Sequence, residues 1–483
     1  MFDRSAQITP HAGDASGSRL HLRLRRGRGP ETGTPDPLSI SNRTVGAVGL
    51  MGADYPGLIF DPCVALGEVV CAGQPVAKMR HDPRLTLTAP VAGTLTQVTR
   101  GARRRLQGLT IAPQGDGAIS FDTKDARHDG AALRALLLAA GAWPGFTTRP
   151  FGRVPEPGVN TGAKSGANPG ANAGAIPDAN ANAKPDANAG AIPGAIPGAI
   201  FITATPSTAA APDPVHVLRP VAEAFEQGVR ALQRLTEGPV FLCQPEGAPL
   251  VAGGDGVVIV HVSGPYPAGL AGPQIHALFP VSNRRSVWQI GYQDVLAIGH
   301  LLITGQVMGS RVISLSGAGL QPALIRVPLG ASLGELTGEL RGEILGDTAQ
   351  AGRRDHGVGL VSGPAPSGRA SAYLGRYDLQ ITATAPATKP AGSKRWWHPG
   401  HVHETPPAIL PNEAFERAFP FDILPVPLMR ALACGDIESA SRLGCLELLD
   451  EDMAVLSGLC PSGNDYGRLL RVVLDALDAE QRV

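Results

Sequence analysis

The chain has 483 residues, of which 43% are hydrophobic, and its 42 basic and 42 acidic residues leave no formal net charge. This length exceeds a single core and predicts about three or four domains, while the balanced charge gives no indication of nucleic-acid or acidic-lipid binding. No apolar run reaches the roughly 18 residues of a membrane-spanning helix, and no signal peptide is evident. We therefore expect any contact with a membrane to run through a partner protein.

The first 125 residues predict a tail and a β-rich domain. Residues 1–18 are expected to be a disordered tail, and His21 to Arg25 alternate polar and apolar side chains, which predicts a short half-buried strand. From residue 44 to residue 122, Gly and Pro separate short apolar runs, a pattern typical of strands that reverse often. We therefore predict a β-rich domain at residues 19–125.

Two segments of this domain, residues 67–76 and 88–95, resemble the barrel-sandwich fold of biotinyl and lipoyl carriers. Those carriers present a modified lysine between methionines at the tip of a hairpin. Here Lys78 is followed by Met79 and then by Arg80, so that triplet is missing. We expect a lipoyl-like fold without an attached group, and modification of Lys78 is the weaker alternative.

Residues 126–320 alternate between helix and strand patterns, which predicts a mostly parallel, Rossmann-like α/β domain. An amphipathic helix with a glycine stop is expected at residues 129–142. At residues 155–200, Gly-Ala-Ile-Pro and Asp-Ala-Asn-Ala recur, and such small residues bury too little apolar area to offset chain entropy, so we expect a disordered insertion. The predicted order after it is strand 201–205, helix 215–235, strand 240–243, strand 257–262, helix 293–302 and strand 311–315.

The remaining residues predict two smaller units. Residues 321–390 return to short strands and turns, which favours a small β-grasp module. Residues 391–483 begin in a loop and continue as helices. The fold class is therefore α/β multidomain, with a lipoyl-like β domain, a Rossmann-like domain, a β-grasp (SLBB-like) module and a helical C-terminal domain.

Eight short phrases stand out along the chain. They are Arg100 to Gln107, Thr148 to Phe151, Arg234 to Gly238, Gly264 to Leu270, Tyr292 to Val295, Leu329 to Leu333, Tyr373 to Tyr377 and Pro420 to Pro425. In this order they make the sequence resemble the A subunit of the sodium-translocating NADH:quinone reductase over residues 20–154 and 201–480. The chain departs from that family in the insertion at 155–200, in its opening after Gly27 and in a shortened region around Trp396.

The resemblance implies membership of a membrane complex that transfers electrons from NADH to ubiquinone and exports sodium. In that family, the A subunit lies peripherally on the cytoplasmic face of the bacterial inner membrane, near the quinone end of the electron path. Its partners are five other proteins, chiefly a membrane subunit that carries flavin. FAD, FMN, riboflavin and a 2Fe–2S centre belong to those partners. We accordingly expect this chain to bind no cofactor and to contact the membrane only through its partners.

Two relatives of the family, the C subunit of the Rnf complex and the flavin-bearing, NADH-binding subunit of complex I, share the architecture and do carry cofactors. The Rnf relative has two Cys-x2-Cys-x2-Cys-x3-Cys-Pro runs, whose thiolates converge on iron–sulfur clusters. In this chain Cys460-Pro461 and Phe419-Pro420 match the ends of the two runs. The earlier ligand positions fall on Leu456, Met453 and Asp450, and on Phe415, Asn412 and Ile409. Because none of these is a thiolate, we predict a degenerate ferredoxin-like scaffold without a cluster.

A dinucleotide site would place Gly-x-Gly-x-x-Gly between a strand and a helix. The loop after strand 257–262 instead carries three prolines, which lack the backbone N–H that a phosphate needs. Tight turns are the favoured interpretation of its glycines. Open α/β sheets nevertheless bind ligands at the carboxyl ends of their strands, so this loop is also our candidate for a quinone or ligand cleft. The candidate residues are Gly264, Tyr266, Pro267, Gly269 and Gly272.

No catalytic residue and no metal site are predicted. Three histidines and Glu404 gather at residues 398–404, but their spacing in a Pro/Gly loop matches no known site, so adventitious metal binding is the favoured interpretation. The alternative function is a stand-alone or Rnf-like oxidoreductase component that binds flavin or NADH itself.

Overall fold

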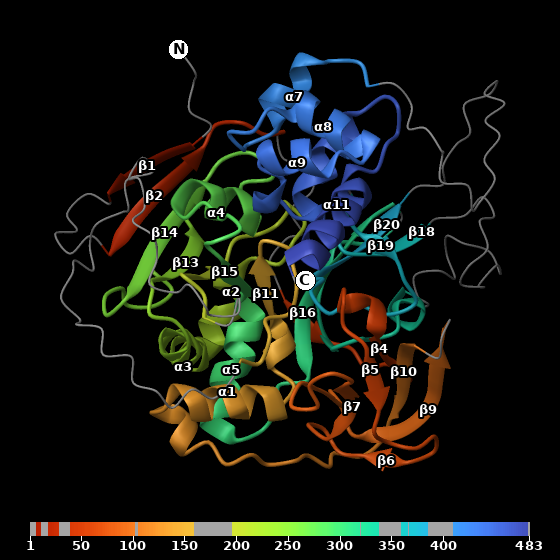
Figure 1. Ribbon diagram of the computed structural model, residues 1–483. Helices are drawn as coiled ribbons and strands as arrows, with labels where there is room; N and C mark the ends of the chain where they lie inside the picture. The colour runs from red at the N-terminus through yellow and green to blue at the C-terminus, as the bar shows by residue number, and fades with distance from the viewer. Residues whose placement is uncertain are drawn as a thin grey trace.

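The computed structural model describes residues 6–10, 18–28, 39–101, 105–158, 196–318, 320–337, 359–365, 367–384 and 409–481. Four β-sheets and a group of C-terminal helices make up this part of the chain (Figure 1). Most of the predicted insertion at 155–200 lies outside the described residues, as do the region around Trp396 and the histidine cluster at 398–404.

The largest sheet has seven strands in the order β1-β2-β14-β13-β12-β15-β11. Its five central strands are parallel, and each edge strand is antiparallel to its neighbour. From β12 the chain adds β13 and β14 on one side and then returns to add β15 on the other, as in doubly wound folds. The strands are β1 (Ala6–Pro10), β2 (Arg19–Leu24), β11 (Phe146–Arg149), β12 (Ile200–Thr203), β13 (Val240–Pro245), β14 (Val257–Ser263) and β15 (Val287–Gly291).

Helices cover both faces of this sheet, which explains why its central strands are hydrophobic almost without interruption. Ile200 and Ile202 share one core with α1, α3 and α5, whereas Phe201 shares another with α4. The helix predicted at 215–235 is divided into α2 and α3, because Pro220 lies between them. The helices are α1 (Gly130–Ala139), α2 (Pro214–Leu218), α3 (Ala222–Leu232), α4 (Ala271–Leu278) and α5 (Tyr292–Thr304).

The N-terminal strands belong to this sheet and not to the lipoyl-like domain. Strand β2 pairs in parallel with β14, so that Leu20 lies opposite Val260 and Leu22 opposite Val262. Strand β1 then pairs with β2. The expectation of a disordered tail at residues 1–18 is therefore wrong for residues 6–10, and the β-rich domain begins later than residue 19.

Two small sheets form the β-rich domain that follows. Their strand orders are β4-β10-β9-β6 and β5-β7-β8, and their buried apolar side chains join the largest hydrophobic core. Lys78 lies within β7, opposite Asp61 and Thr86, and not at the tip of a hairpin. The strands are β4 (Val48–Met51), β5 (Phe60–Pro62), β6 (Val69–Val70), β7 (Pro75–Met79), β8 (Thr86–Thr88), β9 (Gly93–Arg100) and β10 (Leu106–Pro113).

A six-stranded sheet, in the order β19-β18-β20-β16-β17-β3, collects strands from distant parts of the chain. The strand predicted at 311–315 is present as β16, but it pairs with β17 and β20, so the prediction that it closes the Rossmann-like domain is wrong. The α/β domain ends instead with α5. The strands are β3 (Ile40–Asn42), β16 (Ser310–Gly317), β17 (Ala323–Pro328), β18 (Gly359–Ser362), β19 (Arg369–Ala370) and β20 (Gln380–Thr384).

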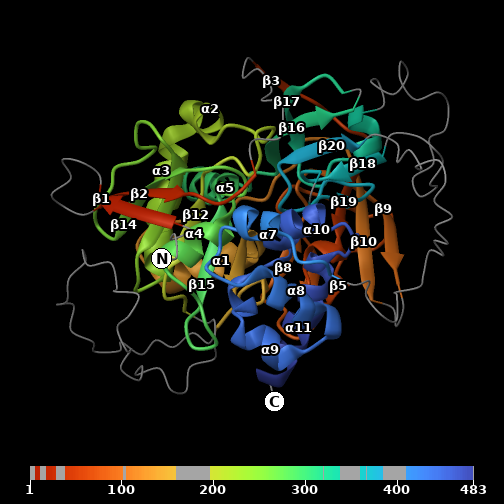
Figure 2. The ribbon, with the colours of Figure 1, turned by 90° about the horizontal axis from the view of Figure 1, so that it is seen from above.

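The C-terminal region is helical, as predicted, and has its own hydrophobic core. Both views place these helices between the α/β sheet on one side and the sheet with β18 and β20 on the other (Figures 1 and 2). The helices are α7 (Glu413–Ala418), α8 (Pro425–Cys434), α9 (Ile437–Arg442), α10 (Ala454–Leu459) and α11 (Tyr466–Gln481).

A buried ion pair joins the C-terminal helices to the α/β sheet. Arg149 ends β11 and Asp452 precedes α10; both are fully buried, and Arg149 Nη1 donates to Asp452 Oδ2 at 2.6 Å. The guanidinium also donates to Gln289 Oε1, to the Glu447 carbonyl and to Glu451 Oε1. A buried ion pair is tolerated when its remaining hydrogen-bonding groups find partners. All three nitrogens of this guanidinium have acceptors, whereas Asp452 Oδ1 has no partner among the described residues.

Asp452→Asn is expected to lower stability strongly, because it removes the nearer and fully buried of the two carboxylates that pair with Arg149 and leaves only Glu451. Removing one partner of a buried pair costs about 3–5 kcal/mol. The midpoint of urea denaturation, followed by circular dichroism, measures the loss. The matched control is Glu226→Gln, which breaks an exposed pair with Arg230 on α3 and should cost about 1 kcal/mol or less. Equal midpoints for the two variants would contradict the role given to the buried pair.

Candidate functional site

The loop predicted as a ligand cleft follows β14 and packs against the C-terminal helices. Tyr266 contacts the hydrophobic core of those helices. Gly264 lies against the carbonyl of Leu24 in β2, and Gly269 lies so close to the carbonyl of Pro206 that a Cβ would be 1.8 Å from it. Gly264, Tyr266, Pro267 and Gly269 therefore lie in one loop that contacts protein on several sides, and Gly272 lies just after it, in the first turn of α4.

The carboxylate of Asp452, from the C-terminal helical region, packs against the first turn of α4. A Cβ on Gly272 would lie 2.0 Å from Asp452 Oδ1, so only glycine allows this approach. Farther along α4, His276 Nε2 accepts from the Asp422 N–H at 2.9 Å, which leaves Nδ1 to donate to Glu447 Oε2 at 2.7 Å. Negative charge is favourable at a helix N-terminus, and Asp452 supplies it here.

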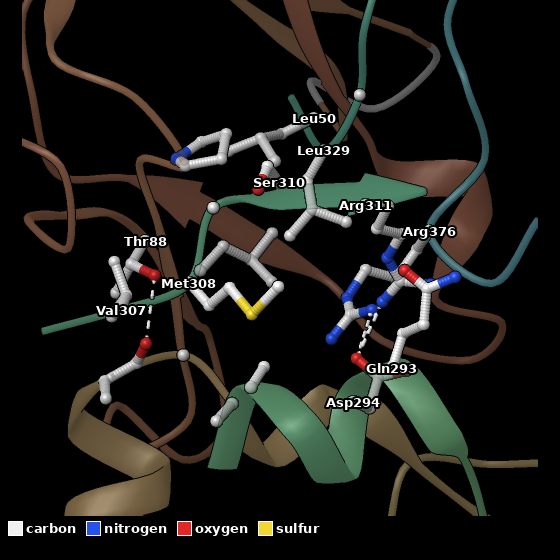
Figure 3. Close-up of a pocket in the computed structure, with 18 of the residues that line it drawn as sticks. Leu50, Thr88, Gln293, Asp294, Val307, Met308, Ser310, Arg311, Leu329 and Arg376 are labelled. Atoms are coloured by element: carbon white, nitrogen blue, oxygen red, sulfur yellow. Dashed lines mark hydrogen bonds and ion pairs between the residues drawn. The ribbon is translucent and has the colours of Figure 1, made fainter. Parts of the chain in front are cut away.

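A separate hollow of about 80 Å³ lies where the β-rich domain, α5 and the six-stranded sheet meet (Figure 3). Its wall is apolar on one side and charged on the other, and none of the five predicted cleft residues lines it. Apolar lining residues include Leu50, Val307, Met308 and Leu329, and polar ones include Gln293, Asp294, Arg311 and Arg376.

The charged side of the hollow holds two arginines that share one carboxylate oxygen. Arg311 Nη2 donates to Asp294 Oδ1 at 2.7 Å, and Arg376 Nη1 lies 2.8 Å from the same oxygen (Figure 3). Asp294 comes from the first turn of α5, Arg311 from β16 and Arg376 from the segment before β20. The cluster therefore joins the α/β domain to the six-stranded sheet.

Burial and charge act against each other in this cluster. Burial lowers the pKa of Arg311, and the Asp294 carboxylate opposes that change. Burial also acts to lower the pKa of Arg376, but Asp294, Tyr55 and Tyr377 outweigh it, so that its pKa is raised. Burial raises the pKa of Tyr55 and of Tyr377, against the nearby charge of Arg376. The raised pKa values keep both tyrosines neutral near pH 7, and the two guanidiniums carry their charge as arginines in proteins do.

Sequence reasoning does not find this hollow. Asp294 and Arg376 both fall within phrases that carry the family resemblance, and Arg311 is the one charged residue of a strand of apolar residues and serines. A charged residue in an apolar run is the available signal, because such a residue needs a partner when it is buried.

Most of the predicted cluster positions of the C-terminal region lie in its hydrophobic core, whereas Asn412 and Asp450 are exposed. Met453, Leu456, Phe415 and Phe419 are at most 1% exposed. The thiol of Cys460 is buried and lies 3.3 Å from the Tyr466 hydroxyl. Within the described residues, no three His, Cys, Asp or Glu side chains form a group that could hold a metal ion. None of the described helices is long and apolar enough to cross a bilayer.

Two family models match the chain: NqrA N-terminal barrel-sandwich hybrid domain at residues 26–114, and NqrA second alpha/beta domain at residues 185–307. Curated relatives are named as the A subunit of Na(+)-translocating NADH-quinone reductase. The protein of Actinobacillus pleuropneumoniae serotype 5b (strain L20) is 33% identical, covering 93% of this chain and 98% of that protein. The Pasteurella multocida (strain Pm70) protein is 34% identical with the same coverage, and that of Pseudomonas aeruginosa PAO1 is 33% identical over 95% of this chain and 100% of its own. The chain belongs to this family.

The family models agree with the observed strand pairing. The first begins at residue 26, after β2, and the second ends at residue 307, before β16. The predictions of a barrel-sandwich domain and of a second α/β domain are therefore confirmed. Among solved structures, a chain of an NAD+-reducing [NiFe]-hydrogenase aligns over 39% of this chain and 40% of its own at 13% identity, with a TM-score of 0.27, which supports no argument.

Gly272→Ala is expected to destabilise the chain, because the new methyl group would meet the Asp452 carboxylate and push the C-terminal helices from α4. The matched control is Gly458→Ala, a glycine within α10 whose Cβ would meet no atom within 4 Å. Alanine in an open helical position should raise stability by about 0.5–1 kcal/mol. Thermal unfolding of both variants gives the comparison, and an unchanged midpoint for Gly272→Ala would contradict the close contact.

Proposed function

We propose that this chain is the peripheral, cofactor-free A subunit of a sodium-translocating NADH:quinone reductase, with a structural role near the quinone site. The observation that carries the proposal is about 33% identity, over nearly the whole length, to proteins with that name. Family membership makes the chain part of an oxidoreductase complex. We further propose that it docks on the cytoplasmic face of the inner membrane, through a partner that carries flavin.

The packing of the C-terminal core supports the proposal that no cluster is bound. A cubane needs thiolates that converge on a space of its own size. The corresponding positions hold Leu456 and Met453 in one run and Phe415 and Phe419 in the other, and their side chains fill the hydrophobic core. We therefore propose that the helices are a degenerate ferredoxin-like scaffold in which apolar packing takes the place of the cluster.

The surroundings of α4 support the proposal that no dinucleotide binds there. A phosphate would need free N–H groups and space at the helix N-terminus. Here Asp452 lies against Gly272, and Pro273 lacks an N–H. We propose in addition that the six-stranded sheet contains the β-grasp module. The quinone cleft proposed at Gly264, Tyr266, Pro267, Gly269 and Gly272 remains a proposal, and contact with a partner protein would have to complete it.

The purified full chain is expected to be colourless, without acid-released flavin and without stoichiometric iron. Absorption spectra, flavin fluorescence and iron analysis check this. Cys460→Ser, in the assembled complex, should leave NADH:quinone reductase activity unchanged, because Cys460 is a packing residue with one weak polar contact. Stoichiometric flavin or iron would favour the alternative, an oxidoreductase component that itself binds flavin or NADH, which the family assignment does not favour.

Docking through a partner predicts a second result. Expressed with the other proteins of the complex, the chain should sediment with the membranes, and expressed alone it should stay in the supernatant after ultracentrifugation. Membrane association of the chain alone would contradict the proposal that a partner provides the contact.

A further inference from the structure

His276 of α4 uses both nitrogens of its imidazole ring to contact the C-terminal helical region. Nδ1 donates to Glu447 Oε2 at 2.7 Å, and Nε2 accepts from the Asp422 N–H at 2.9 Å. The ring also makes an edge-to-face contact with Phe421, with 5.3 Å between the two ring centres. A ring nitrogen that accepts a hydrogen bond carries no proton, so these contacts define a neutral imidazole that is protonated at Nδ1 alone.

The Asp422 N–H depends on this ring for its acceptor. Asp422 lies in the loop between α7 and α8, and within the described residues its N–H donates to His276 Nε2 alone. The side chains on either side of it, Phe421 and Ile423, are buried in the core of the C-terminal helices. The hydrogen bond from Asp422 therefore joins the backbone of this loop to α4.

Protonation of the ring removes this contact. With a proton on Nε2, two N–H donors would face each other at a separation that suits a donor and an acceptor. The Asp422 N–H would lose its acceptor, whereas the hydrogen bond from Nδ1 to Glu447 would persist and become charge-assisted on both sides. The two contacts of the ring thus respond to a proton in opposite ways.

The charged groups around the ring admit an imidazolium. Glu447 faces it from the segment after α9, Asp422 carries a carboxylate in the loop itself, and Asp452 lies against α4 one turn before the ring. The nearby cation is Arg149, which donates to the Glu447 carbonyl and to Asp452. α4 has no other charged side chain, and the ring lies in its last turn, where positive charge is favourable. The side chain is 13% exposed, so a proton can reach it from solvent.

We propose that His276 is a proton-operated contact between α4 and the C-terminal helical region: the neutral ring holds the loop with Asp422 against α4, and protonation at Nε2 releases it. Histidine is the side chain that ordinarily changes charge between about pH 5 and pH 8, so the release is expected as the pH falls through this range. Gly272 lies one turn earlier on the same helix, which places the contact one turn from the cleft proposed above. The contact is present in the isolated chain, so the inference stands or falls separately from the proposed function.

The test is hydrogen exchange of the Asp422 N–H in the full chain, followed by NMR at about pH 8 and about pH 5, with rates corrected for the intrinsic effect of pH. We expect protection at the higher pH and about tenfold less at the lower, the factor that one lost hydrogen bond gives. The control is the Leu250 N–H, which donates at 2.9 Å to Gln244 Oε1, an acceptor that does not titrate. Equal protection of Asp422 at both pH values would overturn the proposal, and so would an equal loss at Leu250, which would indicate general unfolding.

Two variants assign the effect to the ring. His276→Gln places an amide oxygen close to the position of Nε2, so it can accept from the Asp422 N–H but takes up no proton, and protection should be the same at both pH values. His128→Gln removes an exposed histidine before α1 and should keep the original response. Loss of protection at low pH in His276→Gln would assign the effect to the carboxylates and overturn the proposal.

A second measurement on the unaltered chain keeps the test decisive if His276→Gln does not fold. The ring proton signals of His276 should move over the same pH range as the exchange rate of the Asp422 N–H. A ring that stays neutral while this N–H is released would overturn the proposal.

Discussion

The buried pair of Arg149 and Asp452 is the constraint on which the arrangement of the domains depends. A fully buried guanidinium is acceptable at the end of β11 only because the C-terminal helices cover it and supply acceptors. Two further arginines extend the same joint: Arg153 pairs with Asp475 and Asp478, and Arg471 donates to the Phe151 carbonyl. The segment after β11 thus binds the helices through several ion pairs. If these helices moved away from the sheet, the buried charges would be exposed to solvent or would lose their partners.

This joint between the C-terminal helices and the sheet affects whether the carboxyl edge of the sheet is open to a ligand. In open α/β folds that edge is where ligands bind, and the loop after β14 has the glycines that such a site often uses. Here Gly269 and Gly272 allow close approach of protein atoms, from Pro206 and from Asp452. Glycine therefore serves domain packing in this loop. The carboxylate of Asp452 lies at the helix N-terminus, where the phosphate of a nucleotide would otherwise be attracted.

The local parts of the fold could be predicted from the sequence, and the non-local parts could not. Strands β12, β13 and β14 follow from uninterrupted apolar runs, and helix α1 follows from its leucines, its Asp129 cap and Gly141. Strands β2 and β16 are predicted as strands, but their sheets are not, because pairing joins residues far apart in the chain. The hollow escapes prediction for the same reason: Asp294, Arg311 and Arg376 come from three separate segments.

The two charged joints of the molecule differ in their balance, and this difference gives them different roles. At the first, every donor nitrogen of the fully buried Arg149 guanidinium has an acceptor, so the contact holds the C-terminal helices against the α/β sheet. At the second, two guanidiniums share one oxygen of Asp294 beside an apolar hollow. Desolvation of a charge must be offset by partners, and at the second joint the protein supplies too few of them. Within the described residues, the first joint leaves one acceptor, Asp452 Oδ1, without a hydrogen-bond partner, whereas the second leaves two donors, Arg311 Nε and Arg376 Nη1.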